Sequence, residues 1–399
     1  MISVIPSDLD ASRHWTDTTS DAPLLDMQQL CSETGDTECL TLAKHWVRRC
    51  REEHQRCSTA SASAMKVQPA RLLQLAGSAS HPRVLLVTLE VESEVPEYLA
   101  LSYSWGKNSS QTTRLLMSNV EFFSTSGITF ATLPPTIRDA ISTTLSMGFR
   151  YLWIDALCII QDSPDQADWK AEAGKMGGVY RNAVCSVAAL GCRGNDEPLF
   201  RARNPLCDRP CIVPGTNGKW RISNTAHYFF REHEQYGLSA APLHARAWVV
   251  QERISSIRTL FFGESGIFWE RIETTASEPD PDGVLGPPGV NLKNHIDQVL
   301  RSEQEWAKRY SAFRSRWPII LEQYSLCNLT MQSDKLIAIQ GIVNLIGDGI
   351  GWHSHQGLWM NMLEAQLAWK SNVSERIDLS ESGGRAGNGM PSWSWASVK

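Results

Sequence analysis

The chain has 399 residues, of which 42% are hydrophobic and 20% charged, and it carries 15 tryptophans against eight tyrosines. Such a composition is typical of a globular protein with a sizeable core, in two or three domains or in one elaborated domain. The 38 basic and 43 acidic side chains leave a net charge of −5, which argues against nucleic acid or an anionic membrane as a general partner. The many tryptophans predict aromatic packing in cores, pockets or interfaces.

The first residues lack the basic stretch and apolar run of a signal peptide. No apolar run approaches the roughly 18 to 20 residues that span a bilayer, so we expect no membrane span. Ten cysteines are scattered along the chain, and without a secretory signal we expect them to be reduced thiols. These features predict a cytoplasmic protein.

Residues 1–80 are predicted to form a polar N-terminal segment followed by an amphipathic helix. Apolar side chains recur at helical spacing over residues 40–57, while the rest of that stretch is highly charged. The small and polar residues 58–65 predict a linker.

Residues 81–275 are predicted to form an α/β core. Short apolar runs alternate there with helical patterns, and this alternation favours a sheet that contains parallel strands. The expected strands are 84–89, 98–104 and 151–158, and the expected helices are 133–148 and 165–182.

Beyond the core, residues 276–291 are rich in Pro, Gly and Asp and predict a surface loop or linker. Residues 292–399 are predicted to be mostly helical and packed on the core, with helices over 292–326, 334–346 and 358–369. The tail at 391–395 contains two tryptophans and is too apolar to remain in water, so we expect it to pack back onto the body.

Four sequence blocks, 98–106, 133–140, 151–162 and 246–253, resemble in order the blocks of the fungal heterokaryon-incompatibility (HET) domain. The flanking segments resemble that family too, so the resemblance spans most of the chain. One departure is Arg271, which follows Trp269 and Glu270 where family members often carry cysteine. The nucleotide-binding and repeat modules of the large incompatibility proteins are not seen.

The resemblance implies a role in fungal nonself recognition and programmed cell death, with a fungal protein partner or a small-molecule ligand. It also implies distant kinship with the Toll/interleukin-receptor (TIR) fold, hence a TIR-like or flavodoxin-like sheet core with helical N- and C-terminal additions. Some members of that fold cleave NAD, which makes NAD a possible substrate rather than a bound cofactor. The alternative is a stand-alone tailoring enzyme of secondary metabolism, an isomerase or cyclase, and a regulatory scaffold or a homo-oligomer stays open.

Acidic residues gather after the third predicted strand. Asp155 lies at its carboxyl end, where open α/β sheets place ligand-binding groups, and Gln161 follows in the loop. Asp168 and Glu172 are four residues apart and would share one helix face. A carboxylate there is suited to be a general base or to stabilise a cationic, sugar-like transition state. The alternative is that these acids cap and solvate a helix N-terminus.

Cys158 lies in the same stretch and is a candidate nucleophile if a histidine lies near it in space. His244 is the obvious candidate because it precedes the fourth block. A cysteine between Leu157 and Ile159 is more often a buried hydrophobic residue.

A second polar cluster contains Arg246, Trp248 and Gln251. Arg246 is suited either to pair with the acids Asp155 and Glu172 across one α/β crevice or to grip an anionic ligand such as a phosphate. Trp248 and Gln251 are candidate ligand contacts. For Glu252 and Arg253 we favour instead a buried ion-pair network that holds the fourth block against the core.

Tyr103, Ser104 and Trp105, at the end of the second predicted strand, are candidates to line the same crevice. Their aromatic surface would suit a nicotinamide, an adenine or a polycyclic metabolite equally.

Metal and common cofactor motifs are weak. Cys50, His54 and Cys57 share a helical stripe, but a fourth ligand is not apparent, and we predict no metal site. No dinucleotide-binding fingerprint, phosphate-binding P-loop or nucleophile elbow occurs, so dehydrogenases, NTPases and α/β-hydrolases are not supported.

Overall fold

The computed structural model describes residues 3–6, 31–64, 66–90, 94–106, 113–204, 211–215, 218–223, 241–278, 280–284, 291–302, 305–370 and 390–398.

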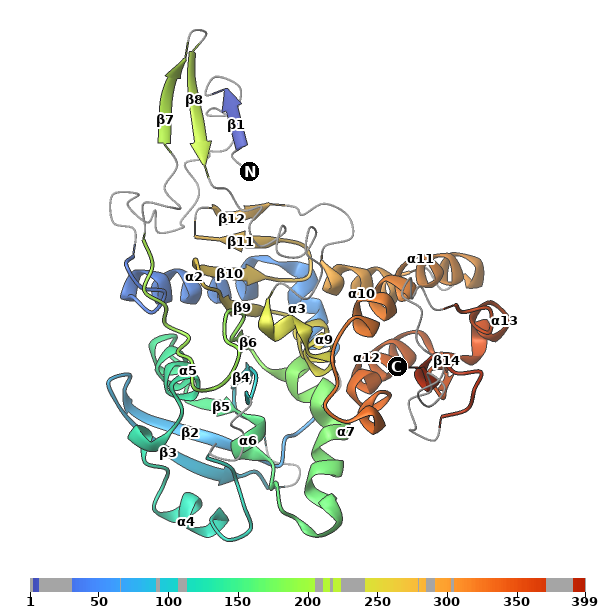
Figure 1. Cartoon of the computed structure of the whole chain (residues 1–399), viewed down its shortest axis with the longest axis horizontal. Helices are drawn as coiled ribbons and strands as arrows, with labels where there is room; N and C mark the ends of the chain where they lie inside the picture. The colour runs from blue at the N-terminus through green and yellow to red at the C-terminus, as the bar shows by residue number, and fades with distance from the viewer. Residues whose placement is uncertain are drawn as a thin grey trace, which may run out of the picture.

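The centre of the molecule is a mixed sheet of nine strands in the order β12-β11-β10-β9-β6-β4-β5-β2-β3, which confirms the α/β class (Figure 1). Four neighbouring strands, β9, β6, β4 and β5, are parallel, and antiparallel strands flank them on both sides. The strands are β2 Arg71–Ser78, β3 His81–Thr88, β4 Leu99–Ser102, β5 Tyr151–Trp153, β6 Cys185–Ala188, β9 Thr259–Phe262, β10 Ile267–Glu270, β11 Thr275–Ser277 and β12 Asp280–Val284.

The middle strands are short and wholly buried. Every residue of β4, β6 and β9 is inaccessible to solvent, as expected for parallel strands that are covered on both faces. Smaller sheets have the orders β1-β8-β7 and β13-β14. Their strands are β1 Ser3–Pro6, β7 Cys211–Gly215, β8 Gly218–Ser223, β13 Ser354–His355 and β14 Leu358–Trp359.

Helices cover both faces of the sheet. In Figure 1, α2 and α5 lie on one side of the strands, and α7, α9 and α12 lie on the other. The helices of the α/β core are α2 Thr37–Glu53, α3 Gln55–Ala62, α4 Val120–Thr125, α5 Pro135–Ser146, α6 Asp155–Cys158, α7 Ala167–Asn182 and α9 Ala247–Ser255.

The helix α7 crosses α12 at a glycine pair. A Cβ atom added to Gly177 would lie 2.6 Å from the Cα of Gly341, so both positions must be small for the backbones to approach so closely. The glycines of this stretch therefore do not interrupt the predicted helix; Gly177 lets it pack.

The C-terminal helices form a second hydrophobic cluster beside the sheet. Phe313 stacks on Trp317, and both contact Trp359. Trp395 is buried in the same cluster and its Nε1 donates a 2.7 Å hydrogen bond to the Gly357 carbonyl, which confirms that the tail packs back. The helices are α10 Leu292–Leu300, α11 Trp306–Ser325, α12 Ile337–Ile350 and α13 Leu363–Gln366.

Several element predictions were wrong. The expected linker 58–65 belongs mostly to α3, because Cys57 and Ala60 are buried and hold it against the body. The segment 276–291 was expected to be a loop, but its described part holds most of β11 and all of β12, and these strands extend the sheet by antiparallel pairing. The segment 358–369 contains β14 and the four-residue α13 instead of one helix, because Leu358 and Trp359 pair with β13.

The predicted strand 151–158 is also shorter than expected. The strand β5 ends at Trp153, and residues 155–158 turn into the short helix α6. This turn moves Asp155 from the end of a strand to the first position of a helix.

Candidate functional site

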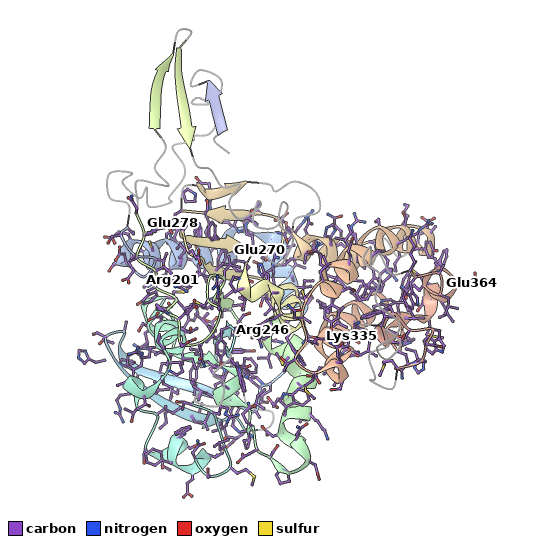
Figure 2. All side chains as sticks on the ribbon, in the orientation of Figure 1. Arg201, Arg246, Glu270, Glu278, Lys335 and Glu364 are labelled. Carbon is purple, nitrogen blue, oxygen red and sulfur yellow. The ribbon has the colours of Figure 1, made fainter. Side chains whose placement is uncertain are left out.

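The carboxyl ends of β4 and β5 meet the N-terminus of α9, and three charged side chains converge there. Asp155 comes two residues after β5 ends, and Arg246 is the residue that precedes α9, near the centre of Figure 2. Glu252 lies on α9 itself. This edge of a parallel sheet is where α/β proteins bind ligands. We call Asp155, Glu252 and Arg246 the charged triad.

Asp155 is half-buried and its carboxylate is held by two donors. Its Oδ2 accepts a 2.9 Å hydrogen bond from the Trp105 indole, and its Oδ1 accepts one of 2.7 Å from the amide of Ala156. Burial raises the pKa of Asp155, while Arg246 and these two donors oppose the rise. The carboxylate is therefore fixed in position and is a stronger base than an exposed aspartate.

Arg246 is held above the same sheet edge. Its guanidinium donates a hydrogen bond to the carbonyl oxygen of Tyr103, and its charge opposes the rise in the pKa of both Asp155 and Glu252. One cation therefore serves two acids, and among the described residues part of its hydrogen-bonding capacity stays available to an anionic ligand.

Glu252 is 5% exposed, and its carboxylate accepts a 2.5 Å hydrogen bond from the hydroxyl of Ser102, the last residue of β4. Burial raises the pKa of Glu252 to about 7, against the opposing effects of Arg246 and Ser102. The acid is thus poised to hold or release a proton near neutral pH.

Glu252 is the site residue that the sequence prediction missed. That prediction placed it in an ion-pair network with Arg253, but Arg253 turns the other way and pairs with Glu270 at 2.5 and 2.9 Å. The sequence signal was small, because Glu252 lies between the polar residues Gln251 and Arg253 and only the fold buries it.

Tyr103 contributes a hydroxyl group beside the triad. The residue is 3% exposed, and within the described chain its hydroxyl makes no hydrogen bond of ordinary geometry. The hydroxyl lies near enough to Asp155 for the two groups to shift each other's pKa, and together with burial Asp155 raises the pKa of Tyr103 well above its usual value. A buried hydroxyl that stays protonated and lacks a regular partner is suited to bind a ligand.

Ser104 and Gly106, which follow Tyr103, interact with the chain's own backbone. The Ser104 hydroxyl accepts a 3.3 Å hydrogen bond from the amide of Gly106. Gly106 has a φ of +78°, and a Cβ atom there would lie 2.9 Å from the Cα of Gly194. The close approach at this glycine is thus made by the chain's own backbone.

Asp168 and Glu172 share one face of α7, as predicted, but that face is directed to β2. Asp168 pairs with both terminal nitrogens of Arg71 at 2.7 and 3.0 Å. Glu172 accepts hydrogen bonds from the amide of Ala70 at 3.1 Å and from Lys175 at 2.8 Å. The two acids therefore fasten α7 to the start of β2, and their hydrogen bonds do not reach Arg246.

Cys158 is wholly buried, and its sulfur accepts a 3.5 Å hydrogen bond from the amide of Ile154. Burial raises the pKa of Cys158 to about 12, so the thiol stays protonated and is a poor nucleophile. The His244 ring packs edge-on against Phe261 at 5.8 Å, in a different cluster of the core.

Gln161 and Gln251 are also held by the chain itself. The Gln161 amide donates to the carbonyls of Asp155 and Ile159 at 3.2 and 3.0 Å and so braces the loop below the triad. Gln251 accepts a 2.5 Å hydrogen bond from the amide of Gly341 and thereby links α9 to α12.

Trp248, on α9, is half-buried and packs between the two large hydrophobic clusters. It meets Trp169 of α7 edge-on, with ring centroids 6.2 Å apart. Its main contacts therefore join α9 to α7.

Among the described residues, no helix has the length and apolarity needed to cross a membrane. Nor does any group of three or more histidine, cysteine, aspartate or glutamate side chains form a possible metal site there.

Residues 98–252 match the family described as heterokaryon incompatibility protein (HET). No curated protein and no solved structure matches the chain. The matched segment contains the whole charged triad and ends at Glu252. The segment 98–252, which holds the charged triad, is therefore similar to the heterokaryon incompatibility family, and we call it the HET domain.

Proposed function

We propose that the HET domain is a hydrolase of NAD that acts in the cytoplasm during fungal nonself recognition and cell death. The observation that carries this proposal is the convergence of Asp155, Glu252 and Arg246 at the carboxyl edge of the parallel strands. A buried and a half-buried acid, both with a raised pKa, beside one cation are the arrangement expected at a catalytic site rather than at a simple ion pair.

The proposed reaction breaks the bond between nicotinamide and ribose. Asp155 stabilises the positive charge that develops on the ribose as the bond breaks, and nicotinamide leaves as a neutral molecule with the bonding electron pair. A water molecule adds to the anomeric carbon and transfers one proton to Asp155. Arg246 holds a phosphate oxygen, and Tyr103 donates a hydrogen bond to the ribose.

A second candidate function is an isomerase or cyclase of secondary metabolism. The pKa of Glu252, about 7, favours it because an acid that is half protonated at neutral pH can both give and take a proton. In that case NAD is not consumed, and the substrate is a small metabolite held by the same residues.

The experiment is incubation of the purified full chain with NAD, with released nicotinamide measured by chromatography. NAD hydrolysis requires nicotinamide and ADP-ribose to appear in equal amounts. Absence of nicotinamide release, together with no toxicity on expression in a fungal host, would contradict the NAD proposal and favour the second candidate.

A further inference from the structure

A groove of about 1060 Å³ lies at the opposite edge of the parallel strands from the charged triad. Its lining includes Tyr98, Val184 and Arg258, which directly precede β4, β6 and β9. Because the triad lies at the carboxyl ends of the strands and this groove at their amino ends, the two are separate sites. The volume is that of a site for a small molecule.

The lining carries more positive than negative charge. Among the described residues, the lining contains four basic side chains, Arg51, Lys66, Arg181 and Arg258, and two acidic ones, Glu94 and Glu97. Both acids are exposed at the rim, and Glu97 is occupied by Arg51 at 2.5 Å. The groove therefore favours an anion.

Arg181, near the end of α7, is the central cation of the groove. It is half-buried, and within the described chain its buried Nε atom has no hydrogen-bond partner. One terminal nitrogen donates to the Ala60 carbonyl across a long 3.4 Å. Asp297 attracts it electrostatically, and one oxygen of that carboxylate is paired with Arg301 at 2.8 Å. A half-buried guanidinium with so few hydrogen bonds to the described residues has donor capacity left for a ligand.

Arg258 is buried near Arg181 and donates its hydrogen bonds to neutral groups. It donates to the Cys50 sulfur at 3.2 Å, to the Ser61 hydroxyl at 3.4 Å and to the Val184 carbonyl at 3.4 Å. Among neighbouring groups the thiol of Cys57 can become anionic, since Cys50 and the nearby arginines hold its pKa at about 6. Even with Glu94, Glu97 and this thiolate counted, the four basic side chains of the described lining leave an excess of positive charge.

The walls between these charges are apolar. Val67, Val95 and Pro96 line the groove and are half-buried, so each presents carbon surface to its interior. A bare inorganic ion would leave this surface in water, whereas a ligand with an organic body covers it.

We propose that this groove binds a small organic phosphate, whose phosphate group is held by Arg181 with Lys66 and Arg258 close by, and whose organic part lies against Val67 and Val95. The planar guanidinium matches the geometry of phosphate oxygens, and its terminal nitrogen, which makes only a long bond to the Ala60 carbonyl, supplies a donor for one of them. This site is independent of the proposed NAD chemistry.

The test is calorimetric titration of the full chain with adenosine monophosphate, pyrophosphate, inorganic phosphate and adenosine at two salt concentrations. We expect adenosine monophosphate to bind more tightly than inorganic phosphate, adenosine to bind at least tenfold more weakly, and affinity to fall with salt. Arg181→Gln should weaken binding about tenfold or more, because a charge-assisted hydrogen bond is lost.

Lys170→Gln is the matched control. Lys170 is exposed on the same helix, so this variant removes one positive charge from α7 and should bind as the wild type does. If Arg181→Gln does not fold, Lys66→Gln at the exposed rim should still reduce the affinity and its salt dependence. Asp155→Asn must leave phosphate binding unchanged.

The proposal is overturned if none of the three phosphate compounds binds at millimolar concentration. It is also overturned if adenosine binds as tightly as adenosine monophosphate, or if the folded Arg181→Gln and Lys66→Gln variants keep the wild-type affinity.

Discussion

The hydroxyl of Ser102 donates a 2.5 Å hydrogen bond to the carboxylate of Glu252, and this bond joins the end of β4 to the helix α9. It shows that the proposed site is part of the core of the domain. The helix that carries Glu252 also bears Arg253, which enters a buried ion cluster on the sheet. Changes at the site should therefore be visible in stability as well as in activity.

The first prediction concerns the pH dependence of stability at Glu252. Its pKa is raised from 4.5 to about 7 in the folded protein, so the folded state binds the proton more tightly. The resulting stabilisation is present below pH 4.5 and is lost as the pH rises through 7, at a cost of about 3 kcal/mol. Glu252→Gln should remove this decline, as measured by urea unfolding at pH 5 and pH 8. An equal decline in both proteins would contradict the assignment.

The second prediction concerns the buried ion cluster on β10. Glu270 is wholly buried, pairs with Arg253 at 2.5 Å, and lies 3.7 Å from the ammonium group of Lys293. Glu270→Gln would remove the buried carboxylate that both cations face, and the free energy of unfolding should fall by about 3 to 5 kcal/mol.

The control for that variant is Glu53→Gln. Glu53 pairs with Arg49 at 2.7 Å on the surface of α2, with its side chain 55% exposed. Loss of this pair should cost less than about 1 kcal/mol. Comparable losses in the free energy of unfolding of the two variants would contradict a stabilising role for the buried cluster around Glu270.

The third prediction concerns the crossing of α7 and α12. Gly177→Ala places a Cβ atom 2.6 Å from the Cα of Gly341, so the helices must separate, and we expect a loss of about 1 to 3 kcal/mol in thermal or urea unfolding. Gly174→Ala, one turn earlier on α7, meets nothing within 4 Å and should stabilise the protein by up to about 1 kcal/mol. The crossing is described incorrectly if both variants change stability in the same direction.

Local patterns were enough to predict much of the α/β core. The helices α5 and α7 and the strand β4 follow from hydrophobic spacing, because each element buries a regular stripe or run. We also expected Asp155 and Arg246 to face each other. In the structure both lie at one edge of the sheet, and Arg246 acts electrostatically on Asp155.

The remaining site contacts depend on the tertiary structure. The sequence places Asp168 and Glu172 on one helix face but does not say that this face meets Arg71 and Ala70. Similarly, adjacent residues Glu252 and Arg253 project in different directions from α9, and only the fold determines that one meets Ser102 and the other Glu270. The strands β11 and β12 are short and are stabilised by pairing with their neighbours, and the Pro and Gly residues of β12 make its sequence resemble a loop.

The most direct test of the proposed function is the rate of nicotinamide release from NAD by the wild type, Asp155→Asn and Asp165→Asn. Asp165 is an exposed acid ten residues away with a φ of +51°, a backbone conformation that asparagine tolerates, so it is a matched control for the same substitution. We predict that Asp155→Asn lowers the rate at least a hundredfold and that Asp165→Asn leaves it unchanged. A folded Asp155→Asn variant that releases nicotinamide at the wild-type rate would contradict the assignment of Asp155 as the catalytic residue.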